Sequence, residues 1–162
     1  MLRTPINSLI LPLFIFSIES IFVGELSSKQ ELDSQIALEF INSYVENCNR
    51  VIEDDALDIL EWSDSSQFVT RTFKEELREM ILEARRQDPV LGIGFDPILD
   101  AQDYPDEGFE IFEFVEETGY VTVIGKRWTD FKLNIIIIKE AGKTLVDGCG
   151  VVNVPEGMRV KR

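Results

Sequence analysis

The sequence predicts an α+β fold in which N-terminal helices pack on a curved antiparallel sheet of four strands. Two patterns indicate this fold. The C-terminal half contains four consecutive runs rich in β-branched and aromatic residues, separated by short turns with Gly or Asp, and such a pattern favours an antiparallel meander. The N-terminal half carries apolar residues at helical spacing. The expected strands are residues 109–115, 120–128, 131–139 and 144–154.

The third expected strand shows why the helices must cover the sheet. Successive side chains of a strand point to opposite faces. One face is wholly apolar and the other is mixed: Phe131, Leu133, Ile135 and Ile137 against Asn134, Ile136 and Ile138. We expect the helices to cover the first face. The second face is the candidate surface for a homodimer.

Three helices are expected upstream of the sheet. The first spans residues 29–48, where apolar residues recur every four positions on one stripe: Leu32, Ile36, Phe40, Tyr44 and Cys48. A short second helix is expected to begin at Asp54 and Asp55, since acidic residues suit a helix N-terminus. The third is expected to start near Thr72, because Thr72 and Glu75 match a capping box.

Residues 88–108 form the longest irregular segment, and long loops in compact domains are often functional. Asp-Pro and Tyr-Pro pairs oppose a helix there. The candidate binding residues in this segment are Asp96, Asp100, Gln102, Asp103 and Tyr104. The carboxylates could bind calcium, but their spacing lacks the ladder of an EF-hand. The sequence therefore favours Asp side chains that cap turns, and predicts no metal site.

The charge of the chain restricts its partners. The sequence has 16 Lys and Arg against 30 Asp and Glu, a formal net charge of -14. This charge repels phosphate backbones and anionic lipid surfaces, so nucleic acid and membrane-surface partners are not expected. A basic protein partner fits the charge, and an acidic surface that serves only solubility is the alternative.

The absence of histidine excludes much of the usual catalytic chemistry. With no histidine in the chain, there is no histidine-based triad and no His-ligated zinc. The two cysteines, Cys48 and Cys149, are too few for a four-thiolate site. They could form one disulfide, but two small buried thiols are the favoured interpretation. No cofactor is predicted.

The ends of the chain differ from its middle. Residues 1–28 resemble a secretory signal peptide with a short linker, because Arg3 precedes an apolar run at residues 9–16. An uncleaved anchor or a buried N-terminal segment is the alternative, since Glu19 interrupts the apolar stretch. Residues 29–155 form one α+β domain, and residues 156–162 form a basic tail, expected to be frayed. A periplasmic or secreted location follows from the first prediction.

The chain also resembles a known family. The order of its helices, the segment from Asp96-Pro97 to Gln102-Asp103-Tyr104, and the hairpin 128–154 with its Leu145-Val146-Asp147-Gly148 run resemble an uncharacterised family of secreted bacterial proteins. That family is assigned to the nuclear transport factor 2-like, or cystatin-like, superfamily. The resemblance implies a cone with a pocket between the sheet and the helices. It differs at Leu145, where relatives often have Trp.

Two functions follow from these observations. The first is a secreted or periplasmic, non-enzymatic binding module whose acidic surface binds a basic protein, or whose cone binds a small apolar ligand. The second is an isomerase or dehydratase, a kind of enzyme that the superfamily also contains. Such an enzyme needs a desolvated carboxylate beside a donor. The candidates are Asp147 as general base and Tyr44 as donor. Because these superfamily enzymes are only an analogy, the binding module is preferred.

Overall fold

A computed structural model describes residues 19–160 of the chain. The helices are α1 (Glu19–Asn49), α2 (Ile59–Ser65) and α3 (Arg71–Gln87), with short 3-10 helices η1 (Arg50–Glu53) and η2 (Glu156–Met158). The strands are β1 (Phe109–Val115), β2 (Tyr120–Gly125), β3 (Lys132–Glu140) and β4 (Lys143–Cys149). They form one antiparallel sheet in the order β1-β2-β3-β4. The predicted α+β class and the antiparallel meander are therefore confirmed.

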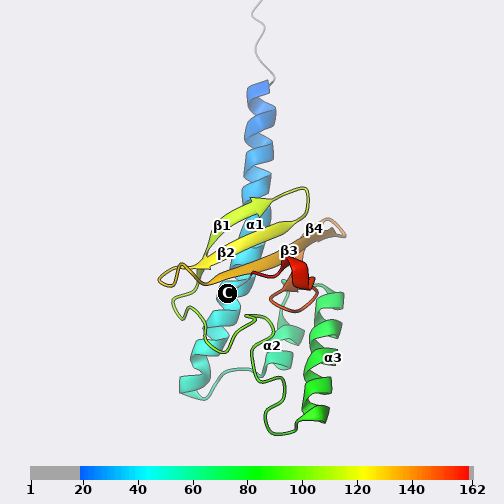
Figure 1. Cartoon of the computed structure of the whole chain (residues 1–162). Helices are drawn as coiled ribbons and strands as arrows, with labels where there is room; N and C mark the ends of the chain where they lie inside the picture. Colours follow the sequence, from blue (N-terminus) through cyan, green and yellow to red (C-terminus); the bar gives the residue numbers. More distant parts are fainter. Residues whose placement is uncertain (1–18, 161–162) are drawn as a thin grey trace, which may run out of the picture.

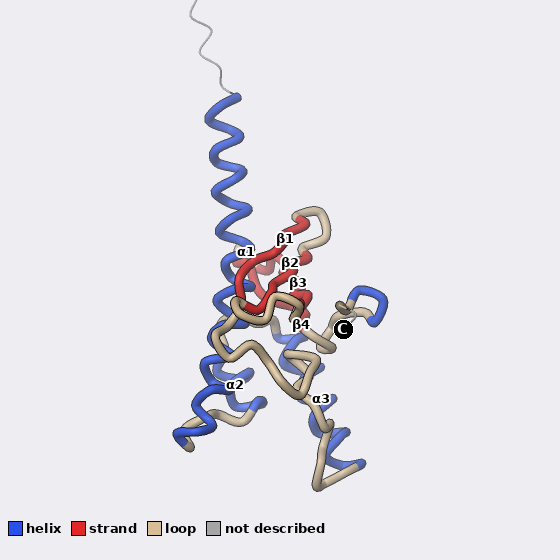
Figure 2. Tube along the Cα trace, turned by 60° about the vertical axis from the view of Figure 1, so that its left-hand side comes forward, coloured by secondary structure: helices blue, strands red, loops and turns tan. Residues whose placement is uncertain are grey.

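The domain is arranged around α1, which contacts all four strands. Figure 1 shows α1 passing behind the sheet, with α2 and α3 on one side of the sheet and the first turns of α1 extending beyond the other. The view in Figure 2 shows the sheet lying against the middle of α1. The C-terminal end of α1 thus lies close to α2 and to the loop that follows α3.

The two faces of β3 are distributed as the sequence predicts. Its apolar face is buried against the helices, whereas Ile138 on the other face is 38% exposed. The amide of Asn134 donates a hydrogen bond of 2.6 Å to the main-chain oxygen of Met158, so the C-terminal segment lies over part of this outer face. The homodimer remains a prediction, and η2 already contacts one of its three candidate residues.

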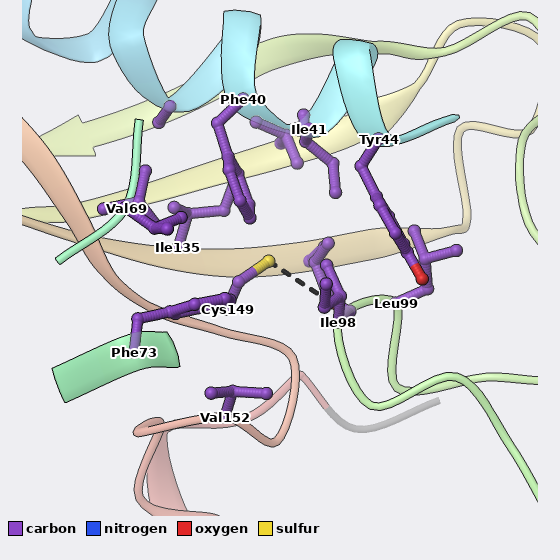
Figure 3. Packing of buried hydrophobic residues seen from close by; sticks show 14 of the residues in the cluster. Phe40, Ile41, Tyr44, Val69, Phe73, Ile98, Leu99, Ile135, Cys149 and Val152 are labelled. Carbon is purple, nitrogen blue, oxygen red and sulfur yellow. Dashed lines mark hydrogen bonds between the residues drawn. The ribbon is translucent and has the colours of Figure 1, made fainter. Parts of the chain in front are cut away.

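The core fills the space between sheet and helices. Figure 3 shows side chains from α1, α3, β3 and the loop before β1 meeting in one cluster. The largest fully buried side chains include Phe40, Phe73, Phe109, Ile98, Leu99 and Ile135. The thiol of Cys149 donates to the main-chain oxygen of Ile98 across this core (Figure 3). The region where the resemblance implies a cone pocket is therefore packed with large apolar side chains.

The helices begin at different residues from those expected. α1 is continuous from Glu19, so it includes the end of the expected signal segment. α2 begins at Ile59 because the carboxylate of Asp58 accepts from the Leu60 amide and caps the helix there. α3 begins at Arg71, since the hydroxyl of Thr70 accepts from the amide of Phe73. The capping residue is thus Thr70 rather than Thr72.

Two strands end earlier than predicted. After β2, the amide of Gly125 donates to the oxygen of Phe131, and a turn starts before Trp128. After β4, Gly150 has a φ of 61°. A Cβ at Gly150 would lie 2.4 Å from the main-chain oxygen of Ile98, so only glycine permits this approach of chain and loop. Gly150 therefore ends β4 and lets the core loop pack beside it.

The ends of the chain bear on the predicted signal peptide and tail. Most of the expected signal segment, residues 1–18, lies outside the described residues, as do Lys161 and Arg162. Within residues 19–160, none of the helices combines the length and the apolar character that a membrane crossing requires. The guanidinium of Arg159 donates to the main-chain oxygens of Val151 and Val154. This part of the expected frayed tail is therefore bonded to the backbone of the domain.

Candidate functional site

A pocket of about 710 Å³ lies at the C-terminal end of α1. We call it the α1-end pocket. Its lining comes from the last turns of α1, from the segment that joins α1 to α2, and from the loop between α3 and β1. Pockets that hold small ligands have volumes of about 300–1,000 Å³, so this one is of suitable size.

One wall of the α1-end pocket is apolar. It consists of side chains that follow α1 in sequence: Val51, Ala56, Leu57 and Ile59. Asn47 holds this segment in place, because its amide donates to the oxygen of Leu57 at 3.0 Å and its carbonyl accepts from the amide of Leu57 at 3.0 Å. Val51 and Leu57 stay 67% and 45% exposed. The pocket thus presents apolar surface to solvent on a fixed backbone.

Tyr44, which lines the pocket, joins α1 to the loop before β1. The hydroxyl of Tyr44 donates a hydrogen bond of 2.5 Å to Oδ2 of Asp96. Oδ1 of Asp96 accepts from the amides of Ile98 and Leu99, at 2.8 and 2.9 Å. The ring of Tyr44 packs on Trp62 of α2, with ring centroids 4.6 Å apart. Asp96 therefore caps its own turn with one oxygen and fastens the loop to α1 with the other, through the hydroxyl of Tyr44.

Burial changes the pKa values of Tyr44 and of the two groups beside it, Cys48 and Asp96. Burial raises the pKa of the Tyr44 hydroxyl, and the negative charge of Asp96 raises it further. Burial also raises the pKa of the Cys48 thiol to about 12, again with a contribution from Asp96. The pKa of Asp96 itself is raised by burial, although its three hydrogen bonds act in the opposite direction. The site thus opposes the formation of new negative charge.

The rim opposite the apolar wall carries polar groups. The hydroxyl of Tyr104 donates to Oδ1 of Asn49 at 3.2 Å, and the amide of Asn49 donates to the main-chain oxygen of Asp106 at 2.8 Å. Burial raises the pKa of the Tyr104 hydroxyl, with further contributions from Cys48, Asp106 and Asp96. These bonds fix Asp106 at the mouth of the pocket.

The five residues predicted for binding do not form one group. Tyr104 lies at the rim of the α1-end pocket, and Asp96 lies behind the lining, where it bonds to the hydroxyl of Tyr44. Asp100 occupies a left-handed backbone conformation with a φ of 53° in the turn after Asp96. Gln102 is exposed and its amide donates to the oxygen of Gly94, and Asp103 is also exposed. The structure therefore brings together two of the five. The side chain of Asp96 both caps its turn, at Ile98 and Leu99, and bonds to Tyr44 of the pocket lining.

The two candidate catalytic residues make different contacts. Tyr44 bonds to Asp96, whereas the carboxylate of Asp147 accepts from the hydroxyls of Thr70 and Thr72 at the start of α3, at 2.6 and 2.5 Å. Strand alternation alone places Asp147 on the face of Leu145 and Cys149. The register between β3 and β4 shifts at this point, so Asp147 is an extra residue in a β-bulge. Its carboxylate is thereby turned toward α3.

Sequence reasoning missed most of the pocket lining. Cys48 was considered for a disulfide and for a thiolate site, but not for a pocket. Both cysteines are free, as the favoured interpretation predicts, although Cys48 is half-buried rather than buried and lines the pocket. A signal was present, because Tyr44 and Cys48 are four residues apart on one helical stripe. No sequence signal indicated Asn47, Asn49 or Asp106, because their place in the pocket depends on contacts between distant segments.

A second pocket, of about 550 Å³, lies near the other end of the sheet. Three of its polar side chains bond to one another: the ammonium of Lys139 bonds to Asp33 and Thr144, and the hydroxyl of Thr144 donates to Asp33 at 2.6 Å. Within residues 19–160, no cluster of acidic or cysteine side chains is arranged to hold a metal ion. The α1-end pocket is therefore the stronger candidate site.

Comparison of the chain with protein-family models, with curated proteins and with solved structures found no significant match.

Proposed function

We propose that the chain is a non-enzymatic binding module that holds a small, largely apolar ligand in the α1-end pocket. The observation that carries the proposal is the pocket itself, with its apolar wall on one side and a few polar groups on the other. Ligand sites in proteins have this composition, in which the apolar wall supplies affinity and the polar groups orient the ligand. The packed core supports placing the ligand in this pocket rather than between the sheet and the helices.

A fluorescent probe tests the proposal. N-phenyl-1-naphthylamine is neutral and apolar, and its fluorescence rises in apolar sites. We expect saturable binding of one probe per chain. Leu57→Trp fills the wall of the pocket and should weaken binding by at least about fivefold, the effect of losing part of a complementary apolar site. Leu82→Trp is the control, because Leu82 is 44% exposed, against 45% for Leu57, but lies on α3 outside the pocket. Absent binding, or equal binding by both variants, would contradict the proposal.

The setting of the protein is also a proposal. We propose a secreted or periplasmic protein of the nuclear transport factor 2-like superfamily. The signal-like N-terminus supports the location, and three helices followed by a meander that lies against α1 support the superfamily. N-terminal sequencing of secreted material tests the location; a mature chain that still begins at Met1 would count against it.

The net charge of -14 supports a basic protein partner. Pull-down at low and high salt tests this partner.

The second candidate function is an isomerase or dehydratase, and one contact favours it. The carboxyl of Asp96 bonds directly to the phenol of Tyr44, a residue that lines the pocket. A carboxylate with a raised pKa beside a donor can move a proton next to a carbonyl group. Against this, Tyr44 is only 2% exposed, and Asp96 already accepts from three donors. The pair therefore acts more readily as a structural contact than as a reacting group.

Proton exchange distinguishes the two candidates. A methyl ketone such as 2-decanone is incubated with the protein in deuterated water, and loss of the protons beside the carbonyl is followed by NMR. An enzyme would accelerate the exchange, Asp96→Asn would abolish the acceleration, and Asp147→Asn would retain it. No acceleration by the wild-type protein would remove this candidate. Circular dichroism shows whether each variant is folded.

A further inference from the structure

The charged lining of the α1-end pocket is acidic. Among the described residues, no Lys or Arg side chain contributes to its lining, and Asp106 stands at its rim. The nearest basic side chain in sequence, Arg50, bonds to Glu46 at 3.1 Å. On the far side of the apolar wall, Arg85 bonds to Asp58 at 2.9 Å. These two guanidinium groups are thus paired with carboxylates. One ammonium group is closer to the rim, because Lys126 lines an adjoining pocket that shares Asn49 and Asp106 with the α1-end pocket.

The negative charge of Asp96 acts on three weakly acidic groups of the pocket, the hydroxyls of Tyr44 and Tyr104 and the thiol of Cys48. Burial raises the pKa of Tyr44, Cys48 and Tyr104, but burial opposes charge of either sign. The contribution of Asp96 does depend on sign, and it raises the pKa of all three groups. A field that opposes a thiolate or phenolate also opposes an anionic ligand, and it favours a cationic one.

The geometry of the rim suits an ammonium group. Asn49 holds the backbone of Asp106, so the Asp106 carboxylate starts from a fixed position at the mouth. Tyr104, half-buried beside it, adds an aromatic ring, and aromatic rings attract cations. The apolar wall formed by Val51 and Leu57 lies in the same pocket. One molecule with an apolar body and a positive head can therefore satisfy both parts.

We propose that the α1-end pocket selects small organic monocations, amines with an apolar body, over neutral and anionic molecules of the same shape. This inference rests on the proposed function, because it concerns the ligand of the same pocket. The apolar body lies along the wall formed by Val51 and Leu57. The ammonium group lies at the rim, between the carboxylate of Asp106 and the ring of Tyr104.

A matched series of probes tests the sign of the charge. Octylammonium, octan-1-ol and octanoate share one apolar chain and displace N-phenyl-1-naphthylamine in competition. We expect octylammonium to bind about threefold to tenfold tighter than octanol, as for a partly exposed ion pair, and octanoate to bind weakest. Added salt should reduce the preference for the ammonium and leave octanol binding unchanged.

Two carboxylate variants locate the selectivity. Asp106→Asn should remove most of the preference, so that octylammonium and octanol bind this variant with similar affinity. Asp103→Asn is the matched control, because Asp103 is an exposed carboxylate on the same loop that does not line the pocket. It should keep the preference. Equal loss in both variants would show that the general acidity of the surface, rather than the rim, selects the cation, and would overturn the assignment.

The outcomes separate this inference from the proposed function. If the neutral probe and octanol bind but octylammonium shows no advantage, the charge selectivity is wrong and the binding function stands. If octanoate binds as tightly as octylammonium, the selectivity is wrong in the same way. If none of the probes binds, both the selectivity and the binding function are wrong.

Discussion

Tyr44→Phe tests the contact on which the candidate site depends. The substitution keeps the ring against Trp62 and removes the hydroxyl, which donates a hydrogen bond of 2.5 Å to Asp96 and also interacts with the Cys48 thiol. A hydrogen bond to a charged group contributes about 1.5–3 kcal/mol and one between neutral groups about 1 kcal/mol. We therefore expect Tyr44→Phe to lower the free energy of unfolding by about 2 kcal/mol at pH 7.

The size of this loss should depend on pH. Burial raises the pKa of Asp96 in the folded state, so the unfolded chain releases this proton first as pH rises from about 3.8. In that window the native state binds more protons than the unfolded state, and the contribution of Asp96 to stability falls as pH rises. The Tyr44 bond favours the ionised form and limits this fall. Its removal should cost about 1 kcal/mol below pH 3.8 and about 2 kcal/mol or more at pH 7.

Urea unfolding followed by tryptophan fluorescence measures the effect at several pH values. The difference between wild type and variant matters, because other carboxylates titrate in both proteins and cancel. Tyr104→Phe is the control, since its hydroxyl makes a longer bond, of 3.2 Å, to Asn49 at the surface. It should cost less than about 0.5 kcal/mol at every pH. A Tyr44→Phe loss that is constant or that shrinks as pH rises would refute the reasoning.

Three further substitutions or reactions have defined outcomes. Burial raises the pKa of the Cys48 thiol from its ordinary value of 9.0 to about 12. The rate of Cys48 alkylation, followed by mass spectrometry of peptides, should therefore rise with a midpoint at about pH 12 in the folded protein. A midpoint near pH 9 would contradict the desolvation of this thiol. Ile135→Ala should lower the free energy of unfolding by about 2–5 kcal/mol, and Ile138→Ala on the exposed face by less than about 1 kcal/mol, measured by urea unfolding; similar losses would contradict the assignment of the two faces. Gly119 and Gly142 both have positive φ, but a Cβ at Gly119 would lie 2.3 Å from a main-chain oxygen of β3 and one at Gly142 meets nothing within 4 Å. Ala at Gly142 should therefore cost about 1 kcal/mol and Ala at Gly119 at least about 3 kcal/mol, and equal melting temperatures of the two variants would refute the difference.

The sheet was predictable because its signals are local. Turn residues such as Gly119 and the alternation of Leu133 and Ile135 with Asn134 act over a few positions, so the meander and the two faces of β3 follow from them. The helix starts were less predictable. Thr70 and Thr72 are both suitable caps, and the choice of Thr70 depends on which hydroxyl reaches a free amide while Asp147 accepts from both.

The candidate site was only partly predictable. Asp96 and Tyr104 were identified as binding candidates, and Tyr44 as a donor, but their grouping was not. Tyr44 and Asp96 are 52 positions apart. The expected partner of Tyr44 was Asp147, but the Tyr44 hydroxyl bonds to Asp96. The side chain of Asp147 turns to α3 because a β-bulge shifts the alternation that the prediction assumed.

The sequence alone determined the α+β class, the order of strands, the buried face of β3 and the acidic character of the surface. These properties depend on residue types and short periods, which a chain carries wherever it folds. The tertiary structure alone decided that the interior is packed and that the pocket lies at the end of α1. The path of the loop before β1 produces both results, since burial of Ile98 and Leu99 draws Asp96 to Tyr44. Contacts between distant segments set that path, and no local pattern encodes them.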